Sequence, residues 1–332
     1  MRTKMTTVLR QLIAEKEITF QVTVATAIHA QMAEAQGFKL IGASGSNFSS
    51  HVLGLPDAGM TTMTEMVENI RRIAHAVEIP LIPDVESGFG TAINVRRTVK
   101  EVILAGAAGL FLEDQTFPPR CGFSKGKTLV SIEEACGKFR AACDARDEID
   151  PDFVIMARCD ARTAVGGGIE ETIRRCKAYR EAGADVIYIE APQTREEIAA
   201  VRAAVDGPMS CSVHALKPLP SLQDLQDLGM CMTMGNHFYK AGLVAMWDLL
   251  ADMKVRGLAP YNEFMGSTAS HPMGSYGPFD LTGFPTVAAW EDKYLPKSAI
   301  DKYEESIGLY DPRKGHVTAV RTIPAATVDG AE

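Results

Sequence analysis

The sequence predicts a closed (β/α)8 barrel, in which eight parallel strands alternate with helices, followed by an extra C-terminal helix. Two observations support this fold class. Eight short apolar runs recur between residues 19 and 234, and the charged segments between them space their apolar residues three to four apart. Several helical segments end at a glycine before the next strand, as in Ala35-Gln-Gly37 and Ala182-Gly-Ala184. An open doubly wound sheet is the main alternative, because it also alternates strands and helices.

The expected strands are continuous apolar runs, as in parallel sheets that are covered on both faces. They comprise residues 19–25, 39–43, 80–84, 109–113, 153–158, 186–190, 209–213 and 230–234. The clearest helices between them comprise residues 64–77, 92–104, 132–146, 170–182 and 195–205. In such a barrel the loops that follow the strands build the active site, so polar residues just after a strand are the first candidates for chemistry.

The regular alternation ends near residue 258, and we expect the barrel to occupy residues 1–258. A Gly- and Pro-rich linker is expected at residues 259–285 and a helical segment at 286–309. Residues 310–332 lack periodicity, which predicts a mobile tail. The helical segment carries apolar residues such as Trp290 and Leu295 that need a covering surface, and another subunit would supply one.

Composition limits the class of partner. The 332 residues carry a net charge of −8 without long blocks of like charge, which disfavours nucleic acid as a partner. No apolar run approaches the ~20 residues that span a bilayer, and the first residues lack a signal-peptide core, so we expect no membrane partner and a cytoplasmic location. The seven cysteines include no Cys-x-x-Cys pair, which disfavours disulfides and a zinc site. A small-molecule ligand is therefore expected.

Carboxylates follow two of the expected strands. Asp84 and Glu86 are separated by one residue and therefore leave the third strand on the same side, and Glu113 ends the fourth. Together with Asp57 they would supply three or four oxygen ligands to a hard cation. Mg²⁺ fits best because it keeps several waters and accepts few protein carboxylates, and Mn²⁺ is the second choice. The alternative for any one of these residues is a cap on the following helix.

Groups that bind anions are expected at the same rim. Arg158 closes the fifth strand and Glu190 the sixth. An arginine there can clamp a carboxylate through two parallel hydrogen bonds, although a structural Arg–Glu pair is the alternative. The turn formed by Ser44, Gly45 and Ser46 offers hydroxyls and backbone amides to an anion, or is an ordinary polar turn.

Cys121 lies on a glycine-rich loop that follows Glu113. Its neighbours in the sequence include Arg120, Lys125 and Lys127. We expect these cations to lower the pKa of the thiol, so that it transfers a proton or attacks an electrophile. The alternative is an inert cysteine, which is the usual state of a lone thiol.

Taken together, these motifs resemble those of the isocitrate lyase/phosphoenolpyruvate mutase superfamily over residues 37–246. The matching pieces are Leu53-Gly-Leu-Pro-Asp57, Asp84-Val-Glu-Ser-Gly-Phe-Gly90, Glu113-Asp-Gln115, Arg120-Cys-Gly122 with Gly126-Lys127, Ala157-Arg158-Cys-Asp160-Ala-Arg162, and Ala182-Gly-Ala-Asp185 leading to Glu190. Each piece is weak alone, but the combination is specific. The resemblance implies a (β/α)8 barrel, Mg²⁺, substrates that are 2-oxo or 2-hydroxy acids, and a homotetramer whose C-terminal helices swap between subunits.

The Arg120-Cys121-Gly122 match resembles the methylisocitrate lyase and 2,3-dimethylmalate lyase branch. It implies Mg²⁺-dependent retro-aldol cleavage of a substituted malate-like 2-hydroxy acid to a 2-oxo acid, such as pyruvate, and a carboxylate. The resemblance assigns catalysis to Cys121, Glu113 and Arg158, with Cys121 protonating the departing fragment. Asp84 and Glu86 would hold the metal, and Glu113 would lie beside it. The substrate would contact Ser44, Gly45, Ser46, Asp57, Phe123, Arg158, Glu190, Ser212 and His237.

Four positions depart from the family pattern. Glu86 and Phe123 replace an aspartate and a histidine, while Thr26 replaces an aspartate and Ser212, close to His214, an asparagine. We therefore expect a substrate with fewer anionic groups, or with an apolar substituent, near Phe123. His237 is a candidate replacement donor, or a core histidine. Two other functions remain open: decarboxylation or hydrolysis of an oxaloacetate-like 2-oxo acid, and a non-catalytic barrel that acts as a binding or assembly subunit.

Overall fold

The computed structural model describes residues 3–235, 238–301, 303 and 306–315. The chain divides into two compact units, with the boundary between residues 237 and 238. We refer to them as the barrel unit and the C-terminal unit, and each is described by itself. His237 lies outside the described residues.

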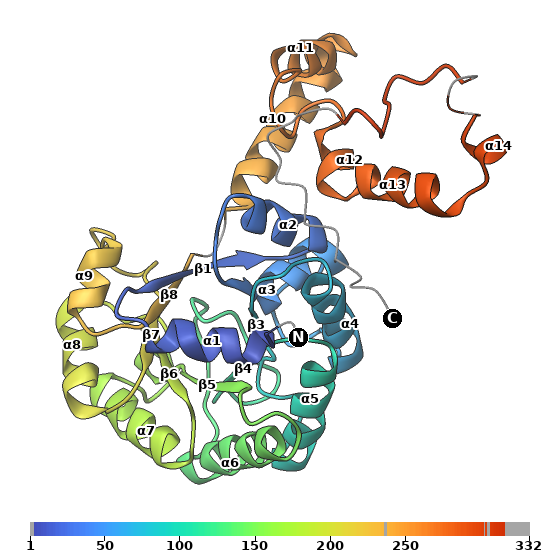
Figure 1. The fold of residues 1–332 in the computed structure, drawn as a ribbon. Coiled ribbons are helices and arrows are strands. Elements are labelled where there is room, and N and C mark those ends of the chain that lie inside the picture. Colours follow the sequence, from blue (N-terminus) through green and yellow to red (C-terminus); the bar gives the residue numbers. More distant parts are fainter. Residues whose placement is uncertain (1–2, 236–237, 302, 304–305, 316–332) are drawn as a thin grey trace, which may run out of the picture. The chain divides into compact units, whose positions relative to one another are not determined.

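Eight parallel strands form the barrel unit (Figure 1). Strand β1 pairs with both β2 and β8, so the first and the last of the eight strands lie side by side. The gap between β3 and β4 is bridged by Asp84 and Phe111, and the amide of Val85 donates to the carbonyl of Phe111 at 3.1 Å. The predicted barrel is therefore confirmed. The strands are β1 (Thr19–Val24), β2 (Ile41–Ala43), β3 (Leu81–Pro83), β4 (Gly109–Glu113), β5 (Val154–Cys159), β6 (Val186–Ile189), β7 (Met209–Cys211) and β8 (Met232–Gly235).

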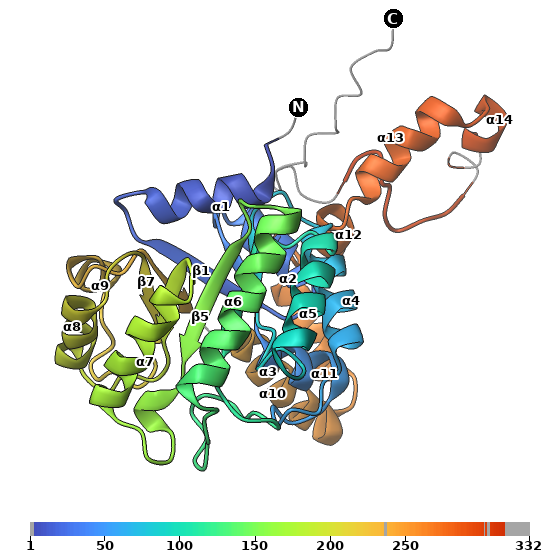
Figure 2. The same cartoon turned by 90° about the horizontal axis from the view of Figure 1, so that it is seen from below.

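Helices follow the strands and cover the outside of the barrel, with α5 and α6 side by side in Figure 2. Their starts follow capping chemistry: Thr62 and Glu65 form a reciprocal capping box on α4, and Ser131 caps α6. Gly106 and Gly183, with φ of 95° and 103°, end α5 and α7 as expected. The helical elements of this unit are α1 (Met5–Ala14), α2 (Ala27–Ala35), α3 (Gly45–Phe48), η1 (Ser49–Leu53), α4 (Met63–Ala74), α5 (Ala92–Leu104), α6 (Ile132–Ile149), η2 (Ala161–Thr163), α7 (Ile169–Glu181), α8 (Arg195–Ala204) and α9 (Leu222–Asp227).

Helix α1 lies across the amino-terminal end of the barrel (Figure 1), and we had not predicted it. Its Leu9 and Leu12 belong to the same buried cluster as strand residues that include Met156 and Tyr188. This cluster is separate from the larger core between strands and helices. Asp185 fixes α1 from outside, because it accepts from Arg10 at 2.8 Å and from Arg146 at 2.7 Å. Helix α1 thus closes this end of the barrel, and the opposite end remains open for an active site.

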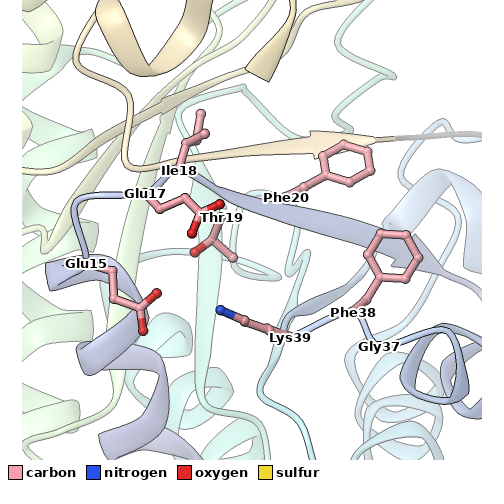
Figure 3. Close-up of a pocket in the computed structure, with 8 residues that line it drawn as sticks. All are labelled: Glu15, Glu17, Ile18, Thr19, Phe20, Gly37, Phe38 and Lys39. Carbon is pink, nitrogen blue, oxygen red and sulfur yellow. The ribbon is translucent and has the colours of Figure 1, made fainter. Parts of the chain in front are cut away.

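A pocket lies beside α1 at this closed end, between the segment that enters β1 and the segment that enters β2 (Figure 3). Phe20 and Phe38 form one side of it, with ring centroids 6.1 Å apart. The lining residues are Glu15, Glu17, Ile18, Thr19, Phe20, Gly37, Phe38 and Lys39. Because these residues precede or begin strands, the pocket is at the opposite end of the barrel from the predicted site.

The C-terminal unit is helical: α10 (Lys240–Arg256), α11 (Ala259–Ser267), α12 (Gly277–Leu281), α13 (Phe284–Tyr294) and α14 (Lys297–Ile300). Residues that we expected in a linker thus form two short helices. Pro260, Pro278 and Pro285 are the second residues of α11, α12 and α13, where an amide hydrogen would have no partner within the helix. Among the residues that the structure describes, no helix is both long and apolar enough to cross a membrane. The swapping of the C-terminal helices between subunits stays a prediction.

Candidate active site

The predicted site residues lie at the carboxyl ends of six consecutive strands. Ser44 follows β2, Asp84 follows β3, Glu113 ends β4, Arg158 is in β5, Glu190 follows β6 and Ser212 follows β7. Each of these side chains is buried. The end of the barrel opposite to α1 therefore carries a compact group of charges within an apolar wall.

Arg158 is the centre of this group. Its Nε donates to Asp160 at 2.8 Å, and its Nη2 lies 3.2 Å from Glu113 Oε2. Nη1 reaches Asp84 Oδ2 only at 3.9 Å. Burial would raise the pKa of Asp160, but Arg158 and Lys127 outweigh it and hold that pKa below its usual range. The guanidinium is thus oriented by Asp160 and Glu113, which leaves Nη1 aimed at the acidic side of the site.

Asp84 and Glu86 form that acidic side. Burial raises the pKa of Asp84 to about 6, and burial followed by repulsion from Asp84 and Asp57 raises the pKa of Glu86 to about 8. Glu86 has a left-handed backbone, with φ of 50°, and its buried Oε1 has no hydrogen-bond partner among the described residues. Two crowded carboxylates, one with an unpaired oxygen, form an environment that a cation would stabilise.

The fit to Mg²⁺ depends on how many carboxylates the ion needs. In the described part of the chain, no three His, Cys, Asp or Glu side chains converge closely enough to hold a metal by themselves. Glu113 is turned toward Arg158 instead, and burial raises its pKa well above the usual range. Mg²⁺ commonly takes one or two protein carboxylates and completes its shell with water and substrate, so Asp84 and Glu86 suit it without a third.

The loop that carries Cys121 crosses this rim. A Cβ on Gly122 would overlap Glu190 Oε1 and lie 2.7 Å from Arg158 Nη2, so only glycine allows the loop to approach so closely. The Cys121 amide donates to the carbonyl of Asp57 at 3.3 Å, and the Asp57 carboxylate is close enough to influence the pKa of the thiol. The loop therefore brings a thiol to the charged group around Arg158.

The expected lowering of the Cys121 pKa is wrong. Burial raises the pKa of this thiol, and the carboxylates of Asp57 and Glu190 add to the rise. Arg120 and Lys125 are exposed, and the ammonium of Lys127 contacts Gly122 and Asp160 instead. Cys121 is consequently protonated at neutral pH, which suits a proton donor better than a nucleophile.

The turn after β2 contacts the acidic side. The amide of Gly45 donates to Asp84 Oδ2 at 3.3 Å, and the hydroxyls of Ser44 and Ser46 are 2.9 Å apart. Space beside Gly45 is limited, because a Cβ there would lie 3.3 Å from the same Asp84 oxygen. This turn helps to hold Asp84, and its two hydroxyls are paired with each other.

Three of the positions that depart from the family pattern lie in different surroundings. Phe123 is 44% exposed and packs edge-on against His214, with ring centroids 5.9 Å apart. Ser212 is fully buried and accepts a hydrogen bond from the amide of Ala191 at 2.7 Å, so its hydroxyl supports the backbone. Thr26 precedes α2 without capping it.

Sequence reasoning missed several buried groups behind the site. Gln115 and Lys138 are almost wholly buried, and Lys138 donates to the carbonyl of Ser87, next to Glu86, at 3.0 Å. Gln115 bonds the backbone of Arg120. The motif Glu113-Asp-Gln115 contained the only available signal for Gln115, and nothing in the sequence distinguished Lys138 from a surface lysine.

Comparisons with known proteins agree with this geometry. The family model described as phosphoenolpyruvate phosphomutase matches residues 9–254. The chain belongs to the phosphoenolpyruvate mutase/isocitrate lyase superfamily. It is 40% identical to 2,3-dimethylmalate lyase of Eubacterium barkeri, over 68% of this chain and 78% of that protein. It is 43% identical to 2-methylisocitrate lyase of Escherichia coli K12, over 62% and 69% of the two chains.

A solved structure extends the comparison to a ligand complex. Phosphonopyruvate hydrolase, in complex with oxalate and Mg²⁺, has a TM-score of 0.77 and 32% sequence identity, and the match covers 89% of this chain and all of that one. The protein is thus an enzyme of this superfamily, and the two curated relatives named above are lyases. The predicted family and enzyme class are confirmed.

Proposed function

We propose that this superfamily member cleaves a carbon–carbon bond of a substituted malate-like 2-hydroxy acid, releasing a 2-oxo acid such as pyruvate and a carboxylate. The observation that carries the proposal is the position of Cys121, which a loop that needs Gly122 brings to the charged group around Arg158. The raised pKa of its thiol supports a role as proton donor. A retro-aldol cleavage leaves an electron pair on the departing carbon, and that carbon must receive a proton. Cys121 donates it and later regains a proton, while Glu113 is our candidate acceptor for the proton of the 2-hydroxyl.

The proposed cofactor is Mg²⁺, held by Asp84 and Glu86 directly or through water. When bound, the ion would polarise the substrate's 2-oxygen and carboxylate. The unpaired Oε1 of Glu86 and the raised pKa of both carboxyls support this assignment. Lys138 supports the same segment from behind through its bond to Ser87.

The proposed substrate contacts follow from the groups left available. Arg158 uses Nε and Nη2 for internal carboxylates, so Nη1 is the donor that faces a substrate carboxylate. The hydroxyls of Ser44 and Ser46 would bind the same anion. Phe123 gives the rim an apolar face next to His214, which favours a substrate with an alkyl substituent over one with a further carboxylate.

A coupled lactate dehydrogenase assay tests the proposal. The assay would detect pyruvate from citramalate, 2,3-dimethylmalate and methylisocitrate by cleavage, and from oxaloacetate by decarboxylation. Malate and isocitrate would release glyoxylate instead, which lactate dehydrogenase also reduces. Each acid is tested with Mg²⁺ and with EDTA. We expect pyruvate from an alkyl-substituted malate, its loss with EDTA, and a fall of about 10²–10⁴-fold in Cys121→Ser, the range of a general acid. Cys231→Ser is the matched control, because Cys231 is the other half-buried thiol and lies where β8 begins. Equal activity in both variants would contradict the role of Cys121.

A second candidate is hydrolysis or decarboxylation of an oxaloacetate-like 2-oxo acid at the same site. The 32% identity to phosphonopyruvate hydrolase favours keeping it. Decarboxylation of oxaloacetate leaves the enolate of pyruvate, which can take its proton from water rather than from Cys121. Activity on oxaloacetate that survives Cys121→Ser would therefore select this candidate. If no acid reacts and calorimetry shows no Mg²⁺ binding, the barrel is a binding or assembly subunit.

We also propose a homotetramer with exchanged C-terminal helices. Helix α10 supports it, because none of its residues is buried although it carries Leu243, Trp247 and Leu250. Light scattering of the full chain would test this assembly, and a monomer at micromolar concentration would exclude it.

A further inference from the structure

We infer that Gln115 and Lys127 are positioning residues that fasten the loop carrying Cys121 to the barrel, with the carboxylate of Asp160 as their common acceptor. The inference rests on the proposed role of Cys121 and extends it to two residues to which we had assigned no role in holding the loop. Three sets of contacts support it: those of Gln115, those of Lys127, and those that Asp160 makes with both.

Gln115 holds the loop just before Cys121. Its side-chain amide donates to the carbonyl of Arg120 at 2.8 Å and accepts from the amide of the same residue at 3.0 Å. A single side chain thus satisfies both backbone groups of Arg120, as a neighbouring strand would. The same Nε2 lies 3.3 Å from Asp160 Oδ1, and Gln115 is 1% exposed. The residue before the thiol is therefore fixed to the barrel wall.

Lys127 holds the loop just after Cys121. Its ammonium donates to the carbonyl of Gly122 at 2.5 Å and to Asp160 Oδ1 at 2.7 Å, and the residue is 1% exposed. Removing an ammonium from water is costly unless it is paired and hydrogen-bonded. Here one partner is a carboxylate and the other is the loop backbone. A buried ammonium thus holds one backbone carbonyl, that of Gly122, next to the thiol.

Other contacts also hold this loop, among them the bond from the Cys121 amide to the carbonyl of Asp57 at 3.3 Å and the packing of Phe123 against His214. Residues 123–126, between Gly122 and Lys127, are all exposed, so the loop has almost no apolar core of its own. Asp160 also accepts from Arg158 Nε at 2.8 Å and Nη2 at 3.1 Å. The same carboxylate therefore orients the guanidinium that faces the substrate and fixes the loop that carries the thiol. Loss of either fastener would displace Cys121 relative to Arg158.

The test measures the accessibility of Cys121 directly. Lys127→Met and Gln115→Met remove the fasteners with side chains of similar length, and Lys125→Met is the matched control, since Lys125 is on the same loop but exposed. Each variant is treated with iodoacetamide, and the alkylation rates of Cys121 and Cys231 are followed by peptide mass spectrometry. Cys231 serves as an internal reference because it lies at the start of β8, in the barrel wall rather than on the loop.

We expect alkylation of Cys121 to become about tenfold faster in Lys127→Met and in Gln115→Met, with Cys231 unchanged and Lys125→Met equal to wild type. Unchanged rates at Cys121 would overturn the inference, and so would a parallel rise at Cys231, which would indicate general loosening. If Lys127→Met does not fold, Gln115→Met decides alone. Alkylation requires no turnover, so this outcome is independent of the substrate assay.

A kinetic readout adds a second criterion once a substrate is known. Because a displacement of about 1 Å in a catalytic group can cost 10²-fold in rate, both fastener variants should lower kcat by about that factor. The Kd for Mg²⁺ should stay within about twofold, since Asp84 and Glu86 are not touched. A loss of Mg²⁺ affinity equal to the loss of kcat would instead indicate a general structural role and overturn the inference.

Discussion

Replacement of Glu86 by glutamine tests whether the acidic side of the site is strained without a cation. The pKa of Glu86 rises from 4.5 to about 8 on folding, mainly through burial. A raised folded-state pKa contributes stability that is complete below pH 4.5 and is lost as the pH rises toward 8. Between pH 5 and pH 8 the metal-free wild type should therefore lose about 3 kcal/mol that the Glu86→Gln variant keeps. Comparing the two pH values cancels the constant cost of burying the new amide.

The assay is urea unfolding in EDTA, followed by circular dichroism at pH 5 and pH 8. Glu17→Gln is the matched control, since Glu17 is exposed in the segment before β1 at the opposite end of the barrel. Adding Mg²⁺ at pH 8 should restore stability to wild type and to Glu17→Gln, and have little effect on Glu86→Gln. If Glu86→Gln and Glu17→Gln show the same change between pH 5 and pH 8, the strain argument is refuted.

Three further predictions concern Mg²⁺ binding, the loop that carries Cys121, and helix α1. Mg²⁺ affinity should fall as the pH drops from 8 to 6, because Asp84 and Glu86 then hold protons that the ion must displace. Calorimetry in two buffers should detect the release of these protons, and a pH-independent Kd would contradict the prediction. Gly122→Ala should cost about 10²-fold in kcat with little change in melting temperature, because its Cβ would overlap Glu190; wild-type kcat would show that the loop is placed elsewhere. Asp185→Ala should lower the free energy of unfolding by about 3 kcal/mol, since Arg10, Arg146 and the amide of Ile155 would lose their hydrogen-bond acceptor. A loss below about 1 kcal/mol would mean that the packing of Leu9 and Leu12 is enough to hold α1.

The positions of some helices and strands followed closely from the local pattern. Residues 92–104 and 109–113 were predicted to the residue as α5 and β4. Shorter strands began later or ended earlier than predicted, because the bounds of a strand depend on where its neighbours pair. Helix α1 was missed although Val8, Leu9 and Leu12 have helical spacing, since its partners include strand residues more than 100 positions away. The helices at 259–267 and 277–281 were not predicted, because the Gly- and Pro-rich composition of residues 259–285 indicated a linker, whereas proline is tolerated in the first turn of a helix.

The sequence predicted which residues gather at the site, but not the direction of the pKa shift at Cys121. Residues that directly follow apolar runs must meet at one end of a parallel barrel, so Asp84, Glu113, Arg158 and Glu190 could be grouped without coordinates. The pKa direction at Cys121 could not be obtained in that way. Proximity in sequence suggested that Lys127 would face the thiol, whereas its ammonium contacts Gly122 and Asp160 in the fold. Burial therefore decides that the pKa of Cys121 is raised rather than lowered.

The sequence by itself determined the fold class, the family and the end of the barrel that carries the charged residues, because these depend on periodicity and on short motifs. Only the tertiary structure decided which charges are paired. Asp160 accepts from Arg158, from Lys127 33 positions earlier, and from Gln115 45 positions earlier. By contrast, one buried oxygen of Glu86 has no hydrogen-bond partner among the residues that the structure describes. Pairing of this kind depends on burial and on distances of a few ångströms between strands and loops, which residue spacing along the chain does not encode.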